Sequence, residues 1–176
     1  GDHNKANAMG VIALSRLLKL PTSAYEKALG EFTGIDRRLQ ELGTKKDITV
    51  LDDYANHPTS YSATIQAVNE KYPESRIWAV VEPHTFSRPK ATLPDYPQAF
   101  KLTHQVIVSK IFASRETDPG DFSGSDIAAA TPHATYIPEF PDIAAYLKSH
   151  TQPGDIILVM GSGDSYKLAH LILKSI

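Results

Sequence analysis

Two short polar clusters in this sequence carry side chains that could bind a small anionic molecule. The first, residues 52–58, reads Asp-Asp-Tyr-Ala-Asn-His-Pro and directly follows the β-rich run Ile48–Leu51. Its carboxylates could accept hydrogen bonds from ribose hydroxyls or lie near a metal, and His57 could donate to an anionic group. The same residues also suit an Asx-type turn and a helix cap, so the cluster alone favours neither explanation.

The second cluster, residues 82–88, reads Glu-Pro-His-Thr-Phe-Ser-Arg after another apolar run. Arg88 can bind a carboxylate or phosphate through two parallel hydrogen bonds, and His84 can exchange a proton near neutral pH. A solvated loop shaped by its proline is the alternative, since a lone histidine is more often structural than catalytic. A second polar loop with similar chemistry favours a binding site.

Two weaker signals lie near the ends of the chain. Residues 161–164 read Gly-Ser-Gly-Asp, and glycines there let backbone amides approach an anion at a helix N-terminus. Tyr166 stands where a dinucleotide fingerprint needs its third glycine, so we predict a tight turn capped by Asp164 or Ser165. Residues 1–7 carry asparagines that could pair with an adenine edge or cap a helix.

Strands and helices alternate along the rest of the chain. Apolar runs predict strands at 38–43, 47–53, 76–81, 106–108, 135–137 and 156–160. Helical patterns cover 6–20, 24–30, 59–71, 94–102, 123–130, 141–149 and the stretch from 164 to 174. We therefore expect an α/β fold, with a Rossmann-like, mostly parallel sheet of about six strands and helices on both faces. Ligands of such sheets lie beyond the carboxyl ends of the strands, where the polar clusters fall.

Composition excludes several classes of function. The absence of cysteine excludes thiolate catalysis and Cys-ligated metals, and it agrees with a cytoplasmic protein. A net charge of -2 without a basic run argues against nucleic-acid binding, and no apolar stretch is long enough to cross a membrane. The sequence also lacks a Gly-x-x-x-x-Gly-Lys-Ser/Thr phosphate loop. Because the first residue is Gly, we expect a piece of a longer protein.

Five motifs, taken in order, resemble those of the Mur ligase family, and together they cover nearly the whole chain. They are Gly-x-His-Asn-x-x-Asn at 1–7, Phe-x-Gly-x-x-Arg-Arg at 32–38, residues 52–58, Pro-His-Thr-Phe-Ser-Arg at 83–88 and residues 161–164. Two departures from the usual pattern are Phe86 in place of Tyr and Asn56 in place of the first of two histidines. Asn56 keeps a hydrogen-bond donor but cannot carry a charge.

The resemblance implies part of an ATP-dependent ligase of cell-wall synthesis. In this family ATP phosphorylates a substrate carboxylate, and an incoming amine attacks the acyl phosphate. Residues 1–33 would be the terminal helical segment of the central ATPase domain, and 34–176 the C-terminal domain. ATP with Mg would be bound mainly by the central domain and the UDP-sugar by an N-terminal domain. The chain would then hold no metal ligand or catalytic residue and would not turn over alone.

The resemblance also implies roles for individual residues. On the ATP side, Asn7 with His3 and Asn4 would face the adenine, Arg38 would approach the phosphates and Asp53 the ribose. The residues expected to line the amino-acid side are Tyr54, Asn56, His57, His84 and Arg88, with Arg88 on the substrate carboxylate.

Three functions remain open at this stage. The first is the branch of the family that joins L-alanine to UDP-N-acetylmuramate, which residues 84–88 favour. The second is the branch that recycles an intact tripeptide, which shares the region around residues 52–58. The third is a non-catalytic module that binds a nucleotide or a protein partner, motivated by the missing phosphate loop. One fold hosts many functions, so the fold cannot decide among them.

Overall fold

The computed structural model describes residues 2–32 and 34–176, and the chain divides into two compact units, residues 1–35 and 36–176. The first unit consists of helix α1 (Asp2–Leu17) packed on helix α2 (Thr22–Glu31). Large apolar side chains of this unit stay exposed, including Met9 at 70% and Leu17 at 78%. The assignment of this segment to an ATPase domain remains a prediction. In the part of the chain that the structure describes, no helix is both long enough and apolar enough to span a bilayer.

The second unit is built on a six-stranded sheet with the order β1-β2-β6-β3-β4-β5. The strands are β1 (Gln40–Lys45), β2 (Ile48–Asp53), β3 (Ile77–Val81), β4 (Gln105–Val108), β5 (Ala134–Tyr136) and β6 (Ile156–Met160). Only β1 runs antiparallel to its neighbour, while all other neighbouring strands are parallel. The predicted α/β fold with a mostly parallel sheet of about six strands is therefore confirmed. The carboxyl ends of five strands meet at one edge.

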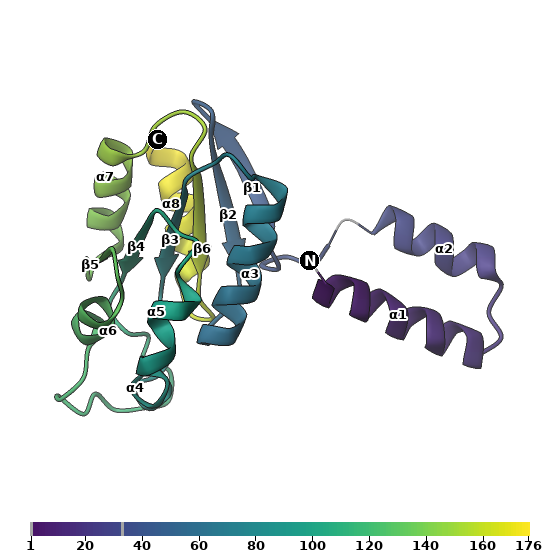
Figure 1. Ribbon diagram of the computed structural model, residues 1–176, viewed down its shortest axis with the longest axis horizontal. Coiled ribbons are helices and arrows are strands. Elements are labelled where there is room, and N and C mark those ends of the chain that lie inside the picture. Colours follow the sequence, from purple (N-terminus) through teal and green to yellow (C-terminus); the bar gives the residue numbers. More distant parts are fainter. Residues whose placement is uncertain (1, 33) are drawn as a thin grey trace. The chain divides into compact units, whose positions relative to one another are not determined.

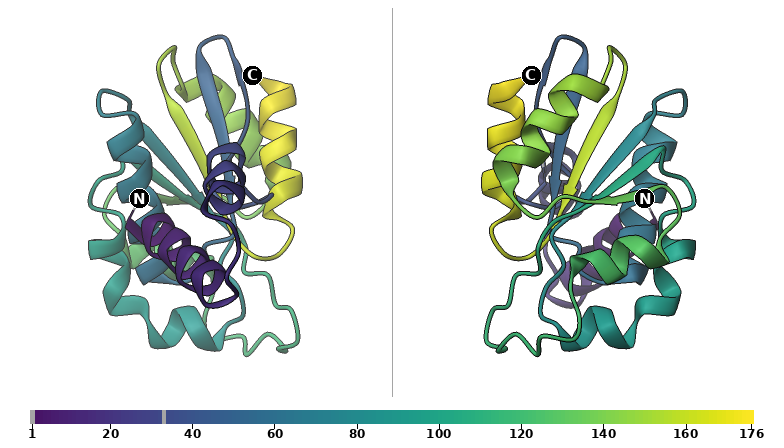
Figure 2. Two further views of the ribbon diagram at one scale, coloured as in Figure 1. Left: turned by 90° about the vertical axis from the view of Figure 1, so that its right-hand side faces the viewer. Right: turned by 90° about the vertical axis from the view of Figure 1, so that its left-hand side faces the viewer.

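Helices cover both faces of this sheet (Figures 1 and 2). One face packs against α3 (Pro58–Lys71), α5 (Tyr96–Ala99) and α6 (Gly124–Ala130), the other against α7 (Phe140–His150) and α8 (Ser165–Ser175). The central strand β6 shows why: Leu158 and Met160 lie in the first core, Ile157 and Val159 in the second, and all four are fully buried. Each such side chain stabilises the fold by roughly 1.5–3 kcal/mol.

The single helix predicted at 94–102 is wrong in extent, because helical backbone ends at residue 99. Residues 87–99 form three short pieces: α4 (Ser87–Ala91), a 3-10 turn (Leu93–Asp95) and α5. Pro94 and Pro97 sit in the first turn of the second and third pieces. Because proline has no N–H to donate, each one prevents the preceding turn from continuing. The sequence pattern also missed α4, which carries Arg88.

Candidate functional site

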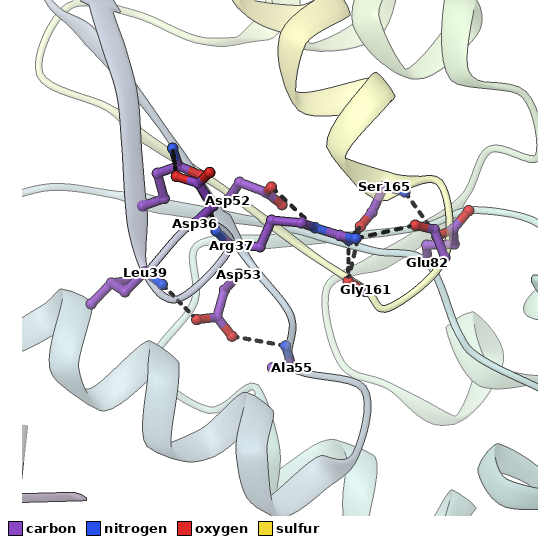
Figure 3. A network of polar contacts seen from close by, with 11 residues as sticks. Asp36, Arg37, Leu39, Asp52, Asp53, Ala55, Glu82, Gly161 and Ser165 are labelled. Carbon is purple, nitrogen blue, oxygen red and sulfur yellow. Dashed lines mark hydrogen bonds and ion pairs between the residues drawn. The ribbon is translucent and has the colours of Figure 1, made fainter. Parts of the chain in front are cut away.

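The loop that follows β2 is anchored by the buried carboxylate of Asp53 (Figure 3). Its Oδ2 accepts a hydrogen bond from Leu39 N at 2.7 Å. Its Oδ1 accepts bonds from Ala55 N at 2.8 Å and Thr64 Oγ1 at 3.2 Å. Through these hydrogen bonds Asp53 links the segment before β1 to helix α3. Its predicted contact with a ribose remains a prediction.

Arg38 and Tyr54 lie together at this loop. The Arg38 side chain is exposed, and its guanidinium carbon is 5.5 Å from the centre of the Tyr54 ring. The ring itself is 40% exposed. Within the described residues, Arg38 makes no ion pair with an acidic side chain, so its five N–H donors are available to an anion such as a phosphate.

Two residues further along, Asn56 contacts Arg88 from α4. Arg88 Nη1 donates to Asn56 Oδ1 at 2.9 Å, and both side chains are half-buried. The bond joins the two polar clusters that the sequence placed in separate loops. One N–H of the guanidinium is used here, and the remaining donors can bind a carboxylate.

His57 begins helix α3 as its N-cap. Its Nδ1 accepts a hydrogen bond from Thr59 N at 3.2 Å, while Ser60 completes a capping box. Accepting through Nδ1 places the ring proton of the neutral form on Nε2. The imidazole therefore fills the position that Ser, Thr, Asp or Asn usually take, and its Nε2–H remains for a ligand.

His84 is half-buried in the loop that precedes α4. Its ring stacks on Phe112 at 5.8 Å between centroids, and its buried Nδ1 has no hydrogen-bond partner among the described residues. Burial lowers the pKa of His84, and the charges of Arg88 and Arg115 lower that pKa further. These effects favour the neutral ring. The next residue, Thr85, has a φ of 63°, an unusual backbone for a β-branched residue.

The turn between β6 and α8 differs from the prediction in how the N-terminus of α8 is capped. Neither Asp164 nor Ser165 caps α8 with its own side chain, and Glu82 from the end of β3 accepts the Ser165 N–H at 2.9 Å instead. A Cβ on Gly163 would come within 2.7 Å of Glu82 Oε2. The glycine is therefore required for packing. Burial raises the pKa of Glu82 to about 7.

Sequence reasoning missed three residues that hold this region in place. Arg37 binds the β6–α8 turn, donating from Nη2 to Gly161 O at 2.7 Å (Figure 3). Glu82 caps α8, and Glu116 accepts hydrogen bonds from the backbone N–H groups at the start of α4. The partners of Arg37 and Glu82 are mostly backbone groups distant in sequence. The motif at 32–38 includes Arg37 and the cluster at 82–88 includes Glu82, but neither pattern indicated these contacts.

The predicted adenine contacts belong to the first unit. Asn4 and Asn7 are exposed residues of α1, while the side chain of His3 lies outside the described residues. Their predicted contact with the adenine remains a prediction. Among the residues that the structure describes, no three His, Cys, Asp or Glu side chains gather as metal ligands would.

Comparison with known proteins identifies the family. Residues 37–163, more than half of the chain and most of the second unit, match the family described as "Mur ligase, glutamate ligase domain". The chain belongs to the Mur ligase family. This match agrees with the resemblance carried by the five motifs.

Curated Mur ligases from other organisms align with almost the entire chain. A UDP-N-acetylmuramate–L-alanine ligase from Acetivibrio thermocellus is 40% identical over 179 residues, covering 99% of this chain. The enzyme of the same name from Alkaliphilus metalliredigens is 40% identical over 176 residues, covering 98%. In both cases the chain spans only 38% of the relative's length.

Solved Mur ligase structures share the fold. A UDP-N-acetylmuramate–alanine ligase from Thermotoga maritima superposes with a TM-score of 0.83 at 23% identity, covering 99% of this chain and 37% of that one. A murein peptide ligase from Psychrobacter arcticus gives 0.73 at 25% identity, covering 99% and 37%.

Proposed function

We propose that this chain is the C-terminal domain, with the helical segment 1–33, of a cytoplasmic ATP-dependent ligase that joins L-alanine to UDP-N-acetylmuramate. The observation that carries the proposal is a pair of cations at one loop. Tyr54 contacts Arg38, and Asn56, two residues later, binds Arg88. Positions two apart in a chain are separated by at most about 7 Å. Two guanidinium groups beside one loop suit a reaction that brings together two anionic molecules.

Each of the two cations would bind a different substrate. Exposed Arg38 would bind phosphate oxygens of ATP, and Arg88 would bind the carboxylate of the incoming amino acid. A fixed carboxylate orients the amine toward the acyl phosphate, and orientation of this kind lowers the barrier of a two-substrate reaction substantially. Neutral His84 and the Nε2–H of His57 would complete the amino-acid side with Tyr54 and Asn56. Asp53 would lie near the ribose, and His3, Asn4 and Asn7 near the adenine.

The remaining machinery would come from elsewhere in the enzyme. Magnesium would be bound there, because the described residues offer no cluster of ligands for it. The exposed apolar side chains of α1, such as Met9 and Leu17, support packing of this helix within a larger domain. The chain's 38% share of its relatives' length agrees with this division.

The test is phosphate release by the full-length protein supplied with ATP, magnesium and UDP-N-acetylmuramate. Reactions with L-alanine, other amino acids, the tripeptide and no acceptor would be compared. We expect release that depends on L-alanine.

The other outcomes separate the alternatives. Release only with the tripeptide would assign the chain to the recycling branch, for which the likeness to the murein peptide ligase gives some support. Absence of any acceptor-dependent release would overturn the ligase proposal and favour a non-catalytic binding module.

A further inference from the structure

Arg37 holds the start of the second unit against the turn that opens α8 (Figure 3). Its Nη2 donates to Gly161 O at 2.7 Å and to Ser165 Oγ at 2.9 Å. Its Nε lies 3.4 Å from Oδ2 of the buried Asp52. Nη1 also donates to Gly163 O at 3.4 Å, so two of the three guanidinium nitrogens bond to the β6–α8 turn and its first helical residue, while the third lies beside a carboxylate. Arg37 therefore has a different task from its exposed neighbour Arg38.

The backbone on both sides of Arg38 is strained and held in place. Arg37 has a φ of 60° and Leu39 a φ of 49°, in the left-handed region that costs roughly 1–2 kcal/mol per residue. Two hydrogen bonds hold these conformations, from Tyr54 N to Arg37 O at 2.8 Å and from Leu39 N to Asp53 Oδ2 at 2.7 Å. The direction in which the Arg38 side chain points away from the backbone is thus set by Arg37 and Leu39.

Aromatic rings link the two arginine side chains. The Arg37 guanidinium carbon lies 5.1 Å from the centre of the Tyr166 ring and 5.0 Å from that of Tyr54. The Arg38 guanidinium lies 5.5 Å from the same Tyr54 ring. Both distances to Tyr54 fall within the range of cation–π attraction. The ring that Arg38 contacts is therefore held in part by Arg37.

We propose that Arg37 is a positioning residue that aims Arg38 at the phosphates of ATP. The part concerning ATP rests on the proposed function. The part concerning Arg38's position rests on the contacts of Arg37 alone. Lysine at position 37 would keep the charge but lose the planar fork that reaches Gly161, Ser165 and Asp52 together.

The kinetic test is a double-mutant cycle in the full-length protein. We expect Arg37→Lys to raise the KM for ATP by about 10-fold, because small misplacements of a binding group are costly. In an Arg38→Ala background the same substitution would add little, since Arg37 acts through Arg38. Equal effects in both backgrounds would overturn the proposal, as would an unchanged KM.

Arg76→Lys is the matched control. Arg76 makes paired hydrogen bonds of 2.8 and 2.7 Å to Asp155, also a buried carboxylate. Both residues directly precede strands, β3 and β6, so they lie at the sheet edge opposite the candidate site. This variant would lower stability without changing the KM for ATP. It thus separates positioning from a general loss of stability.

Hydrogen exchange in the 176-residue chain provides a readout that needs no activity. Arg37→Lys would speed exchange at the amides of Leu39 and Tyr54, whereas Arg76→Lys would not. If both amides stay protected in Arg37→Lys, the proposal is overturned whatever the activity. If exchange at both amides becomes faster while the full-length protein shows no L-alanine-dependent phosphate release, the ligase proposal fails and the positioning of Arg38 stands.

Discussion

Arg88 donates a hydrogen bond to Asn56 across 2.9 Å, joining α4 to the loop that follows β2. Because Oδ1 of Asn56 accepts this bond, its Nδ2 group keeps two donors for a ligand. A substrate carboxylate at this pair would meet N–H groups from both side chains. In the proposed site, Asn56 would therefore orient the charged Arg88 at the position where the family pattern has a histidine.

Asn56→Asp should harm amino-acid binding more than Asn56→Ala. Aspartate has nearly the same shape, but it would pair with Arg88 and repel the substrate carboxylate. We expect the KM for L-alanine to rise about 100-fold in Asn56→Asp and about 10-fold in Asn56→Ala, the low end for loss of one hydrogen bond to a charged group. Steady-state kinetics of the full-length protein would measure both. Similar effects of the two substitutions would contradict this role.

Arg88→Ala should raise the KM for the amino acid while leaving that for ATP nearly unchanged. Removal of the guanidinium takes away the cation proposed for the carboxylate, whereas Arg38 lies on the Tyr54 side of the loop. The expected rise is at least 10-fold, since charge-assisted hydrogen bonds contribute roughly 1.5–3 kcal/mol each. Arg88→Lys should recover part of the loss. Unchanged kinetics in Arg88→Ala would remove this residue from the site.

His84 should report on the same cation through its titration. Burial is the main cause of its lowered pKa, and the charge of Arg88 is the next. Arg88→Ala should therefore raise the His84 pKa, so that the ring gains its proton at higher pH than in the unmodified chain. NMR titration of the ring nitrogens in the 176-residue chain would measure the change. Arg76→Lys is the control, and an equal change there would refute a local electrostatic cause.

Much of the fold could be predicted because buried parallel strands are continuous apolar runs. Ile156–Met160 is an example: every residue of the run is buried, and it became a strand near the centre of the sheet. The spatial order of the strands could not be predicted, since β6 pairs with β2 and β3 across long stretches of sequence. Local periodicity contains no information about such pairing.

Motifs marked part of the candidate site. Asn56 and Arg88 were named from two separate loops, and the structure joins them by a hydrogen bond. Arg37 could not be given a role, because its partners Gly161 and Ser165 lie more than a hundred residues away. A sequence pattern does not indicate which distant backbone carbonyl a side chain will contact.

Gly163→Ala should destabilise the second unit, while the neighbouring Ser162→Ala should not. The added Cβ would lie 2.5 Å from Phe112 Cγ and 2.7 Å from Glu82 Oε2, and overpacking costs typically 1–3 kcal/mol. Ser162 has a buried hydroxyl without a partner among the described residues, so its removal should change the free energy of unfolding by less than about 0.5 kcal/mol. Urea unfolding of both variants would measure the difference. Equal losses would mean that the turn tolerates no change at all.

Glu82→Gln should make the stability of the 176-residue chain less dependent on pH. Burial raises the pKa of Glu82 from 4.5 to about 7, so between these values the folded chain binds more protons than the unfolded chain. Stability from this group therefore falls as pH rises from about 4.5 to 7 and is constant above that range. Glutamine stays neutral and can still accept the Ser165 N–H.

The variant should therefore gain stability over the unmodified chain as pH rises, by about 2–3 kcal/mol at pH 8. Urea unfolding of both proteins between pH 5 and 8 would measure the difference, and comparing the two removes the contributions of groups they share. A constant difference across this range would show that Glu82 is ionised throughout. In that case the cap on α8 would come from a carboxylate, and the charge of Arg37 would outweigh the cost of burying it.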